Sequence, residues 1–157
     1  MRTGLGIDTH RFAEGRKLIL GGVEIPHSRG LQGHSDADVL AHAITDAILG
    51  AASLGDIGTH FPDSDPAYKD ADSIALLREA VRRVAEAGWR VEHVDATVML
   101  ERPKLAPHRE AIMGRLSEAV GGSVHVKATT GEGMGFVGRE EGVAALAVAT
   151  LTLTSPA

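Results

Sequence analysis

Residues 142–153 read GVAALAVATLTL and contain no charged side chain. Their small and β-branched residues favour a β-strand that is apolar on both faces. The stretch is too short to span a bilayer. Such a strand lies either at the centre of a sheet, with small residues facing solvent, or in a sheet face that neighbouring subunits bury. We favour the second interpretation.

The segments before this strand predict the rest of a sheet and three helices. Alternation of apolar and polar residues predicts the strands, and apolar residues at helical spacing predict the helices. The expected elements are a strand at 3–12, a hairpin at 17–25 with Gly21 and Gly22 as its turn, a helix at about 36–52 capped by Ser35 or Asp36, a loop at 54–73 with one helical turn, a helix from Asp72 or Ser73 to about 87, a strand at 89–100, a helix at 107–122, and strands at 123–130 and 142–153. This order suggests an α/β (α+β) sandwich, a mixed sheet with helices on one face, formed by residues 1–157 as a single domain.

Composition and charge exclude several classes of protein. With 157 residues, 43% of them hydrophobic, the chain is long enough for one well-packed domain. The net charge of -5 argues against a protein that wraps nucleic acid or docks on an anionic membrane. Because the chain has no cysteine, any metal must be bound by His, Asp or Glu. Residues 1–10 contain no apolar leader, and we expect a soluble cytoplasmic protein.

Acidic and histidine side chains in the first third of the chain have the spacing of a metal site. Asp8 and His10 lie two residues apart in a predicted strand, so they point to the same side. His42 lies on the first predicted helix, one turn from Asp38 and from Asp46. If this helix faces the strand, Asp8, His10 and His42 form a site with an open coordination position, as catalytic zinc requires. Asp38 or Asp46 would hydrogen-bond the second ring nitrogen of His42. Each side chain alone is more simply a surface residue, and only the set favours a metal.

A glycine-rich segment, residues 127–142, reads KATTGEGMGFVGREEG and follows a predicted strand. It is not a Walker motif, because Lys127 precedes the glycines. Thr129 and Thr130 could offer hydroxyl and backbone N–H groups to phosphate oxygens, and Glu132 could hold a divalent cation that bridges them. A flexible turn with solvated charges explains the same residues equally well.

Four stretches together resemble one known family. They read GIDTHRF (6–12), GHSDADVLAHAITDAILGAASLGDIGTHFPDSDPAYKDADS (33–73), ERPKL (101–105) and KATTGEGMGFVGREEG (127–142). In this order, over nearly the whole chain, they are similar to the 2-C-methyl-D-erythritol 2,4-cyclodiphosphate synthases of the non-mevalonate isoprenoid pathway.

The resemblance implies a metal-dependent phosphorus–oxygen lyase. In the family reaction, the 2-phosphate of 4-diphosphocytidyl-2-C-methyl-D-erythritol 2-phosphate attacks the β-phosphorus of the same molecule, and CMP leaves. The resemblance assigns zinc to Asp8, His10 and His42, and magnesium or manganese on the substrate diphosphate to Glu132. It places His34 and Thr130 on either side of the transition state, where hydrogen bonds to developing charge and tight positioning matter most.

The resemblance also implies substrate contacts and an assembly. The family is a homotrimer with active sites between subunits, which would cover the apolar last strand. A central three-fold channel, lined here by Phe136, Arg139 and Glu141, would take an isoprenoid diphosphate. The substrate-contacting residues implied are Asp8, Thr9, His10, His34, Ser35, Asp56, Ile57, Gly58, Phe61, Pro62, Asp63, Ser64 and Asp65 around the methylerythritol; Leu100, Glu101, Arg102, Pro103, Lys104, Leu105 and Ala106 around the cytidine; and Thr129, Thr130, Gly131 and Glu132 around the phosphates.

Two positions depart from the family pattern. Position 131 is glycine where many relatives carry a polar residue, and Asp70 stands where glycine is common.

Two other functions compete with the one that the resemblance implies. One is another His/Asp metalloenzyme that acts on phosphorylated small molecules, or an iron oxygenase or zinc hydrolase. The other is a non-catalytic trimeric protein that binds an isoprenoid.

Overall fold

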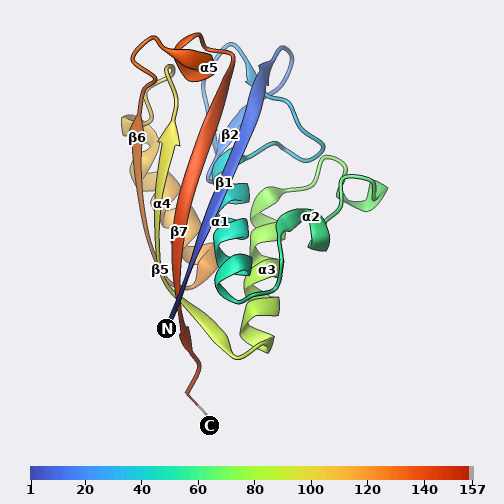
Figure 1. Cartoon of the computed structure of the whole chain (residues 1–157). Helices are drawn as coiled ribbons and strands as arrows, with labels where there is room; N and C mark the ends of the chain where they lie inside the picture. Colours follow the sequence, from blue (N-terminus) through green and yellow to red (C-terminus); the bar gives the residue numbers. More distant parts are fainter. Residues whose placement is uncertain (156–157) are drawn as a thin grey trace.

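A computed structural model describes residues 1–155 of the chain (Figure 1). Within this range the strands are β1 (Arg2–Ala13), β2 (Leu18–Leu20), β3 (Val23–Ile25), β4 (Gly30–Leu31), β5 (Trp89–Met99), β6 (Ser123–Thr129) and β7 (Gly142–Leu153). The helices are α1 (Val39–Ala51), α2 (Ile57–His60), η1 (Pro66–Tyr68), α3 (Ser73–Glu86), η2 (Ala106–His108), α4 (Arg109–Val120) and α5 (Gly135–Gly138).

The main sheet has the strand order β4-β1-β7-β5-β6. β5 and β6 run parallel, whereas β1 pairs antiparallel with β4 and β7, and β7 pairs antiparallel with β5. β2 and β3 form a separate hairpin. Helices α1, α3 and α4 lie on the same face of the sheet (Figure 1). The predicted mixed sheet with helices on one face is confirmed.

Strand β7 occupies the centre of the sheet, between β1 and β5. Its helix-facing residues are buried, as a central strand requires. On the opposite face, Leu5 and Ile7 of β1 remain 62% and 55% exposed. They lie across from Val148 and Leu146 of β7. We call these four residues the outer apolar strip; in a single chain it faces solvent.

Helix α1 packs closely on β1 because two glycines on the inner face of β1 leave room for it. A Cβ atom at Gly4 would lie 2.1 Å from the carbonyl oxygen of Ala47, and one at Gly6 would lie 1.9 Å from that of Ala43. A larger residue at either position would push the helix away. The same face of β1 continues to the predicted metal ligands, so this close packing sets their distance from His42.

Helix α1 begins at Val39, three residues later than predicted. Its N-cap is Asp38, whose carboxylate accepts hydrogen bonds from Ala41 in the helix and from both glycines of the β2–β3 turn. The predicted caps, Ser35 and Asp36, are therefore wrong. The hairpin turn fixes Asp38 through a contact between residues 16 apart in the chain, which no local pattern reveals.

Most other elements lie where the sequence predicted them. The hairpin turns at Gly21 and Gly22, and Asp72 caps α3. The loop between α1 and α3 contains two short turns, α2 and η1, instead of one. Helix α5, inside the glycine-rich segment, was not predicted. None of the helices within residues 1–155 is both long and apolar enough to cross a membrane.

Candidate metal centre and substrate pocket

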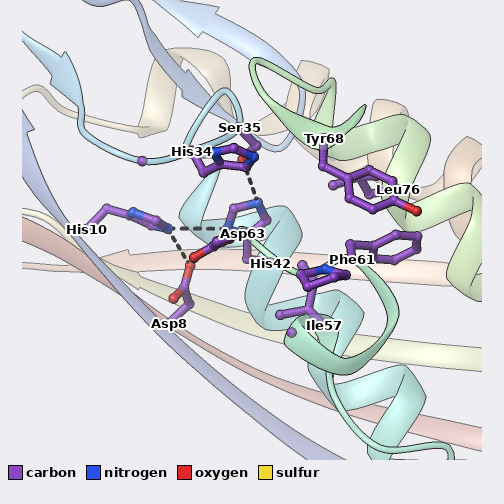
Figure 2. A pocket seen from close by; sticks show the side chains of 13 residues that line it. Asp8, His10, His34, Ser35, His42, Ile57, Phe61, Asp63, Tyr68 and Leu76 are labelled. Atoms are coloured by element: carbon purple, nitrogen blue, oxygen red, sulfur yellow. Dashed lines mark hydrogen bonds and ion pairs between the residues drawn. The ribbon is translucent and has the colours of Figure 1, made fainter. Parts of the chain in front are cut away.

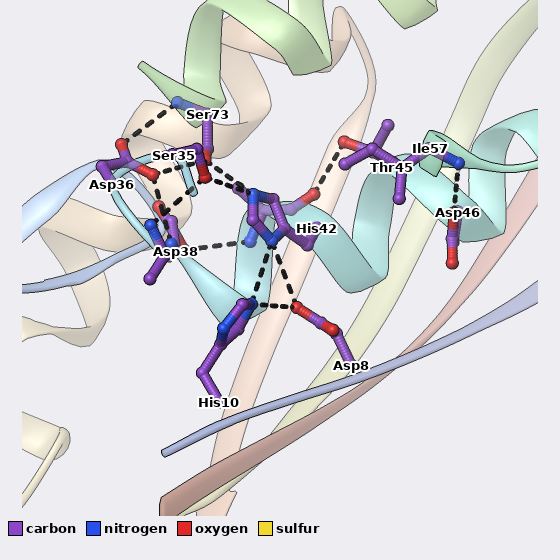
Figure 3. A network of polar contacts seen from close by, with 12 residues as sticks. Asp8, His10, Ser35, Asp36, Asp38, His42, Thr45, Asp46, Ile57 and Ser73 are labelled. Atoms are coloured by element: carbon purple, nitrogen blue, oxygen red, sulfur yellow. Dashed lines mark hydrogen bonds and ion pairs between the residues drawn. The ribbon is translucent and has the colours of Figure 1, made fainter. Parts of the chain in front are cut away.

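Three side chains from β1 and α1 converge on one point. Asp8 Oδ2 lies 2.8 Å from His10 Nε2 and 3.2 Å from His42 Nδ1. The two histidine nitrogens are themselves 3.2 Å apart. Figure 3 shows the three atoms facing one another between the strand and the helix. The group predicted from the sequence spacing is thus brought together, and it is the possible metal-binding group found among the described residues.

The spacing of these atoms fits a divalent cation. Zinc–ligand bonds of about 2.0–2.1 Å at tetrahedral angles put neighbouring ligand atoms about 3.3 Å apart. The three observed separations, 2.8, 3.2 and 3.2 Å, are close to this value. One carboxylate and two imidazoles also suit other divalent metals, including iron.

The surroundings of His10 prepare its Nε2 atom for a metal. Its other nitrogen, Nδ1, lies 2.8 Å from the carbonyl oxygen of Gln32. A carbonyl oxygen only accepts, so Nδ1 carries a hydrogen and neutral His10 has its lone pair on Nε2. Burial opposes charge on His10, but the hydrogen bond and the negative charge of Asp8, together with the Gln32 carbonyl, raise its pKa.

The carboxylate of Asp8 is held ionised. Burial opposes its charge, but hydrogen bonds to His10 and His42 and the positive charge of these rings outweigh burial and lower the pKa of Asp8 to about 2. A cation bound at this point would take the place of any histidine proton that faces Asp8.

The second ring nitrogen of His42 does not meet an aspartate. His42 Nε2 lies 2.8 Å from Ser73 Oγ at the start of α3 and 3.2 Å from Ser35 Oγ. The prediction that Asp38 or Asp46 binds this nitrogen is wrong, because both carboxylates accept hydrogen bonds from other groups. Asp38 caps α1, and Asp46 accepts the N–H of Ile57 at 2.8 Å. The His42 side chain is only 13% exposed, so it is not the surface residue that it would be taken for on its own.

A cavity of about 330 Å³ opens beside the three ligands (Figure 2). Aromatic and apolar side chains from α2, the loop after it and α3 form the wall opposite the metal group. The lining residues predicted from the sequence are Asp8, His10, His34, Ser35, His42, Ile57, Gly58, Phe61, Pro62 and Asp63. Gly33, Tyr68 and Leu76 also line the cavity and were missed. Tyr68 packs edge-on against Phe61. An aromatic residue after a proline-rich turn was the sequence signal that could have placed Tyr68 in this wall.

Four of the residues predicted to surround the methylerythritol do not line this cavity. Thr9 points to the other side of β1 and lines a separate depression with Phe136. Asp56 caps α2 by accepting the N–H and hydroxyl hydrogens of Thr59. Asp65 caps η1, and its carbonyl oxygen lies 3.2 Å from His34 Nε2. Ser64 is outside the lining set as well. Local capping thus explains two of the aspartates in this loop.

A second cavity, of about 190 Å³, lies between the segment after β5 and the end of β6. Its lining residues are Leu100, Glu101, Pro103, Lys104, Leu105, Ala106, Ala128, Thr129 and Thr130. All of these except Ala128 were predicted to bind the cytidine or the phosphates. Arg102 lies outside this lining set and pairs with Glu140 at 3.1 Å. The two cavities share no lining residue.

The glycine-rich segment folds back on the second cavity. The carboxylate of Glu101 accepts hydrogen bonds from Gly131 N (2.8 Å) and Gly133 N (3.1 Å). Thr130 Oγ accepts the N–H of Glu132 at 3.2 Å. Gly131 and Glu132 do not line the cavity itself. Phe136 is 43% exposed, and Arg139 pairs with Glu141 at 2.9 Å.

The two departures from the family pattern have structural reasons. A Cβ atom at Gly131 would lie 2.6 Å from the backbone nitrogen of Gly138 and 2.8 Å from the carbonyl oxygen of Met134. This loop therefore closes tightly only with glycine at position 131. Asp70 has a φ angle of +57°, a left-handed conformation that glycine adopts without strain and aspartate tolerates.

The fold and the site together define a class: α/β proteins that present a candidate divalent-metal site at the side of an open cavity. Comparison with known proteins identifies the family. Residues 1–152 match the YgbB family. The chain belongs to this family, and relatives similar to it over nearly their whole length are named 2-C-methyl-D-erythritol 2,4-cyclodiphosphate synthases.

The similarity to relatives extends over nearly the whole chain. The chain is 62% identical over 154 residues to the synthase of Salinibacter ruber, covering 96% of this chain and 98% of the relative. Among solved structures, a 2C-methyl-D-erythritol-2,4-cyclodiphosphate synthase in a CDP-bound form has 41% identity and a TM-score of 0.88, over 96% of this chain and 100% of that one. The bifunctional IspDF of Campylobacter jejuni has 45% identity and a TM-score of 0.94, over 98% of this chain and 42% of that one.

Proposed function

We propose that this chain, as one catalytic domain of residues 1–157, is a cyclodiphosphate synthase. An oxygen of the substrate's 2-phosphate attacks the β-phosphorus of its cytidine diphosphate arm. The bond from that phosphorus to the oxygen of the α-phosphate breaks, CMP leaves, and no water is consumed. The observation that supports this best is the convergence of Asp8, His10 and His42 beside a cavity in a chain 62% identical to a named synthase.

The metal at the Asp8, His10 and His42 group is proposed to be zinc, with magnesium or manganese on the substrate diphosphate near Glu132. A bound cation supplies Lewis-acid neutralisation and orientation of a phosphate, which offsets the repulsion between two anions that must meet. The residues of this chain do the remaining work. Around the cavity they hold the methylerythritol and exclude water, and His34 and Thr130 donate hydrogen bonds to the charge that develops at phosphorus.

We infer further that the working enzyme is a homotrimer with active sites between copies. One chain carries a metal-side cavity with His34 and a separate cavity with Thr130, and no residue lines both. His34 and Thr130 are proposed to flank one transition state. They can do so if they come from neighbouring copies of the chain. The outer apolar strip gives those copies a surface to bury. We also propose that the trimer acts in the cytoplasm.

Phe136 and Arg139 are proposed to lie at the central channel of the trimer. Phe136 is 43% exposed and would offer apolar surface to an isoprenoid. The side chain of Arg139 is 63% exposed, and its guanidinium would pair with a diphosphate. The alternative is a trimeric protein that only stores such a ligand, but this alternative gives no role to the group of Asp8, His10 and His42.

Phosphorus NMR tests the proposed reaction. The protein is incubated with zinc, magnesium and 4-diphosphocytidyl-2-C-methyl-D-erythritol 2-phosphate. We expect CMP and a cyclic diphosphate to appear in equal amounts. Release of inorganic phosphate would indicate a metallohydrolase instead, and unchanged substrate with metal bound would overturn the proposed function.

A further inference from the structure

The polar contacts behind His42 form a chain that leads away from the candidate metal point. Asp36 Oδ1 accepts the hydroxyl hydrogen of Ser73 in a short hydrogen bond. Asp36 Oδ2 also accepts the backbone N–H of Ser73 at 3.1 Å. Ser73 Oγ in turn lies 2.8 Å from His42 Nε2. Figure 3 shows Asp36, Ser73 and His42 in this order, with Asp8 and His10 beyond the ring.

The direction of each hydrogen bond in this chain follows from the number of hydrogens available. An ionised carboxylate only accepts, so the single hydroxyl hydrogen of Ser73 points to Asp36. Ser73 Oγ then has only lone pairs to offer His42, and His42 Nε2 must carry the hydrogen between them. A neutral imidazole has one N–H, so the lone pair of His42 is left on Nδ1, the atom that faces Asp8 and His10.

We propose that Ser73 and Asp36 are positioning residues that fix the tautomer of His42 and thereby complete the metal site. This inference rests on the metal site proposed above and adds two residues to it. Ser73 is fully buried at the first turn of α3, so its hydroxyl cannot turn to solvent for another partner. The strand-and-helix site therefore depends on a third element, α3, that supplies no ligand of its own.

Ser35 is the natural comparison, because its hydroxyl also approaches the ring. Ser35 Oγ lies 3.2 Å from His42 Nε2, further than Ser73, and 3.4 Å from Ser73 Oγ. Among the described residues, no carboxylate contacts the Ser35 hydroxyl, which accepts the N–H of Ala37 at 3.3 Å instead. Ser35 therefore has no anion that orients its hydroxyl hydrogen. The tautomer should depend on Ser73 and much less on Ser35.

Two measurements on purified protein test the proposal. Nitrogen-15 NMR of the His42 ring in the metal-free protein reports which nitrogen carries the hydrogen, and calorimetric titration with zinc reports the Kd. We expect the unaltered protein to hold the hydrogen on Nε2. In Ser73→Ala the hydrogen moves to Nδ1, where Asp8 accepts it, and zinc binding weakens by about 10- to 100-fold. Asp36→Ala frees the Ser73 hydrogen to point at Nε2 and has the same two effects, while Ser35→Ala has neither.

The outcomes separate this inference from the proposed metal site. If the unaltered protein binds no zinc or other divalent cation at Asp8, His10 and His42, the metal site itself is wrong. If it binds zinc and folded Ser73→Ala or Asp36→Ala keeps both the tautomer and the Kd, the positioning role is wrong. Equal weakening in Ser35→Ala would also overturn it, because a general loss of polar contacts would then explain the result. A far-ultraviolet circular dichroism spectrum unchanged from the unaltered protein identifies the folded variants.

Discussion

The guanidinium of Arg83 on α3 lies 2.6 Å, Nη1 to Nδ1, from the ring of His60 at the end of α2. His60 Nε2 lies 2.7 Å from the carbonyl oxygen of Leu54, so this nitrogen donates and Nδ1 accepts from Arg83. The Arg83 guanidinium also lies 5.1 Å from the centre of the Phe61 ring, and Glu79 binds its Nε at 2.8 Å. One arginine thus connects α3 to the segment that forms the wall opposite the metal group in the first cavity.

We predict that Arg83→Gln raises KM about fivefold with a smaller change in kcat. The hydrogen bond to His60 and the contact with Phe61 are each worth on the order of 1 kcal/mol, and their loss loosens the wall that Phe61 provides. Steady-state kinetics on the variant measures the change. Arg82→Gln is the matched control, because Arg82 binds Glu79 and Glu86 but touches neither His60 nor Phe61. An Arg83→Gln enzyme with unaltered KM would show that this contact does not shape the cavity.

His42→Ala should abolish metal binding and lower turnover roughly 1000-fold, since several kcal/mol of Lewis-acid stabilisation disappear with the ligand. The variant should fold, but with a loss of about 1–2 kcal/mol in the free energy of unfolding. The ring is only 13% exposed and its hydrogen bond to Ser73 is lost, so the substitution is not neutral for packing. Kinetics, metal analysis and urea unfolding measure the three effects. Turnover near that of the unaltered enzyme would rule out the metal assignment.

How much of this site the sequence predicts depends on the range of the contacts. The period of two in β1 is local, and it correctly places Asp8 and His10 on one face. The partner of His42 Nε2 is not local, because Ser73 lies 31 residues further along and reaches the ring only once α3 packs on α1. A different close contact, that of α1 on β1, did have a local signal that was missed: Gly4 and Gly6, since glycines on one face of a strand indicate a nearby backbone.

Zinc affinity should fall as the pH falls through the pKa of His10. Asp8 raises this pKa above the ordinary value of 6.5, so at and below neutral pH the metal-free ring increasingly carries the proton that a cation must displace. Below this pKa, the apparent affinity drops about tenfold per pH unit for each proton released. Calorimetry in two buffers of different ionisation enthalpy counts the protons. Binding that releases none between pH 6 and 7, roughly the range around the ordinary histidine pKa, would contradict the assignment of His10 as a ligand.

Thr130→Ala should lower kcat about 100-fold and raise KM much less. The Thr130 oxygen accepts the N–H of Glu132, which leaves its hydroxyl hydrogen free for a substrate oxygen. A donor aimed at charge that develops only in the transition state affects kcat most. Thr130→Ser keeps the hydroxyl and serves as the control. An effect on KM alone would assign Thr130 to ground-state binding.

Leu5→Glu should separate metal binding from turnover. Leu5 is 62% exposed in the outer apolar strip and lies opposite Val148, so a buried charge there would break a trimer. Asp8, His10 and His42 come from one chain, and their metal should stay bound in the resulting monomer. Turnover should fall to background, because the cavity with His34 and the cavity with Thr130 are no longer brought together by neighbouring copies.

Light scattering, zinc titration and CMP release measure the three properties on the same sample. Leu5→Val, which keeps the strip apolar, should leave all three unchanged. A Leu5→Glu protein that stays trimeric would show that the strip is not the interface. A monomeric Leu5→Glu protein that still releases CMP would show that one chain holds a complete active site, because no partner residue would then be needed to flank the transferred phosphorus.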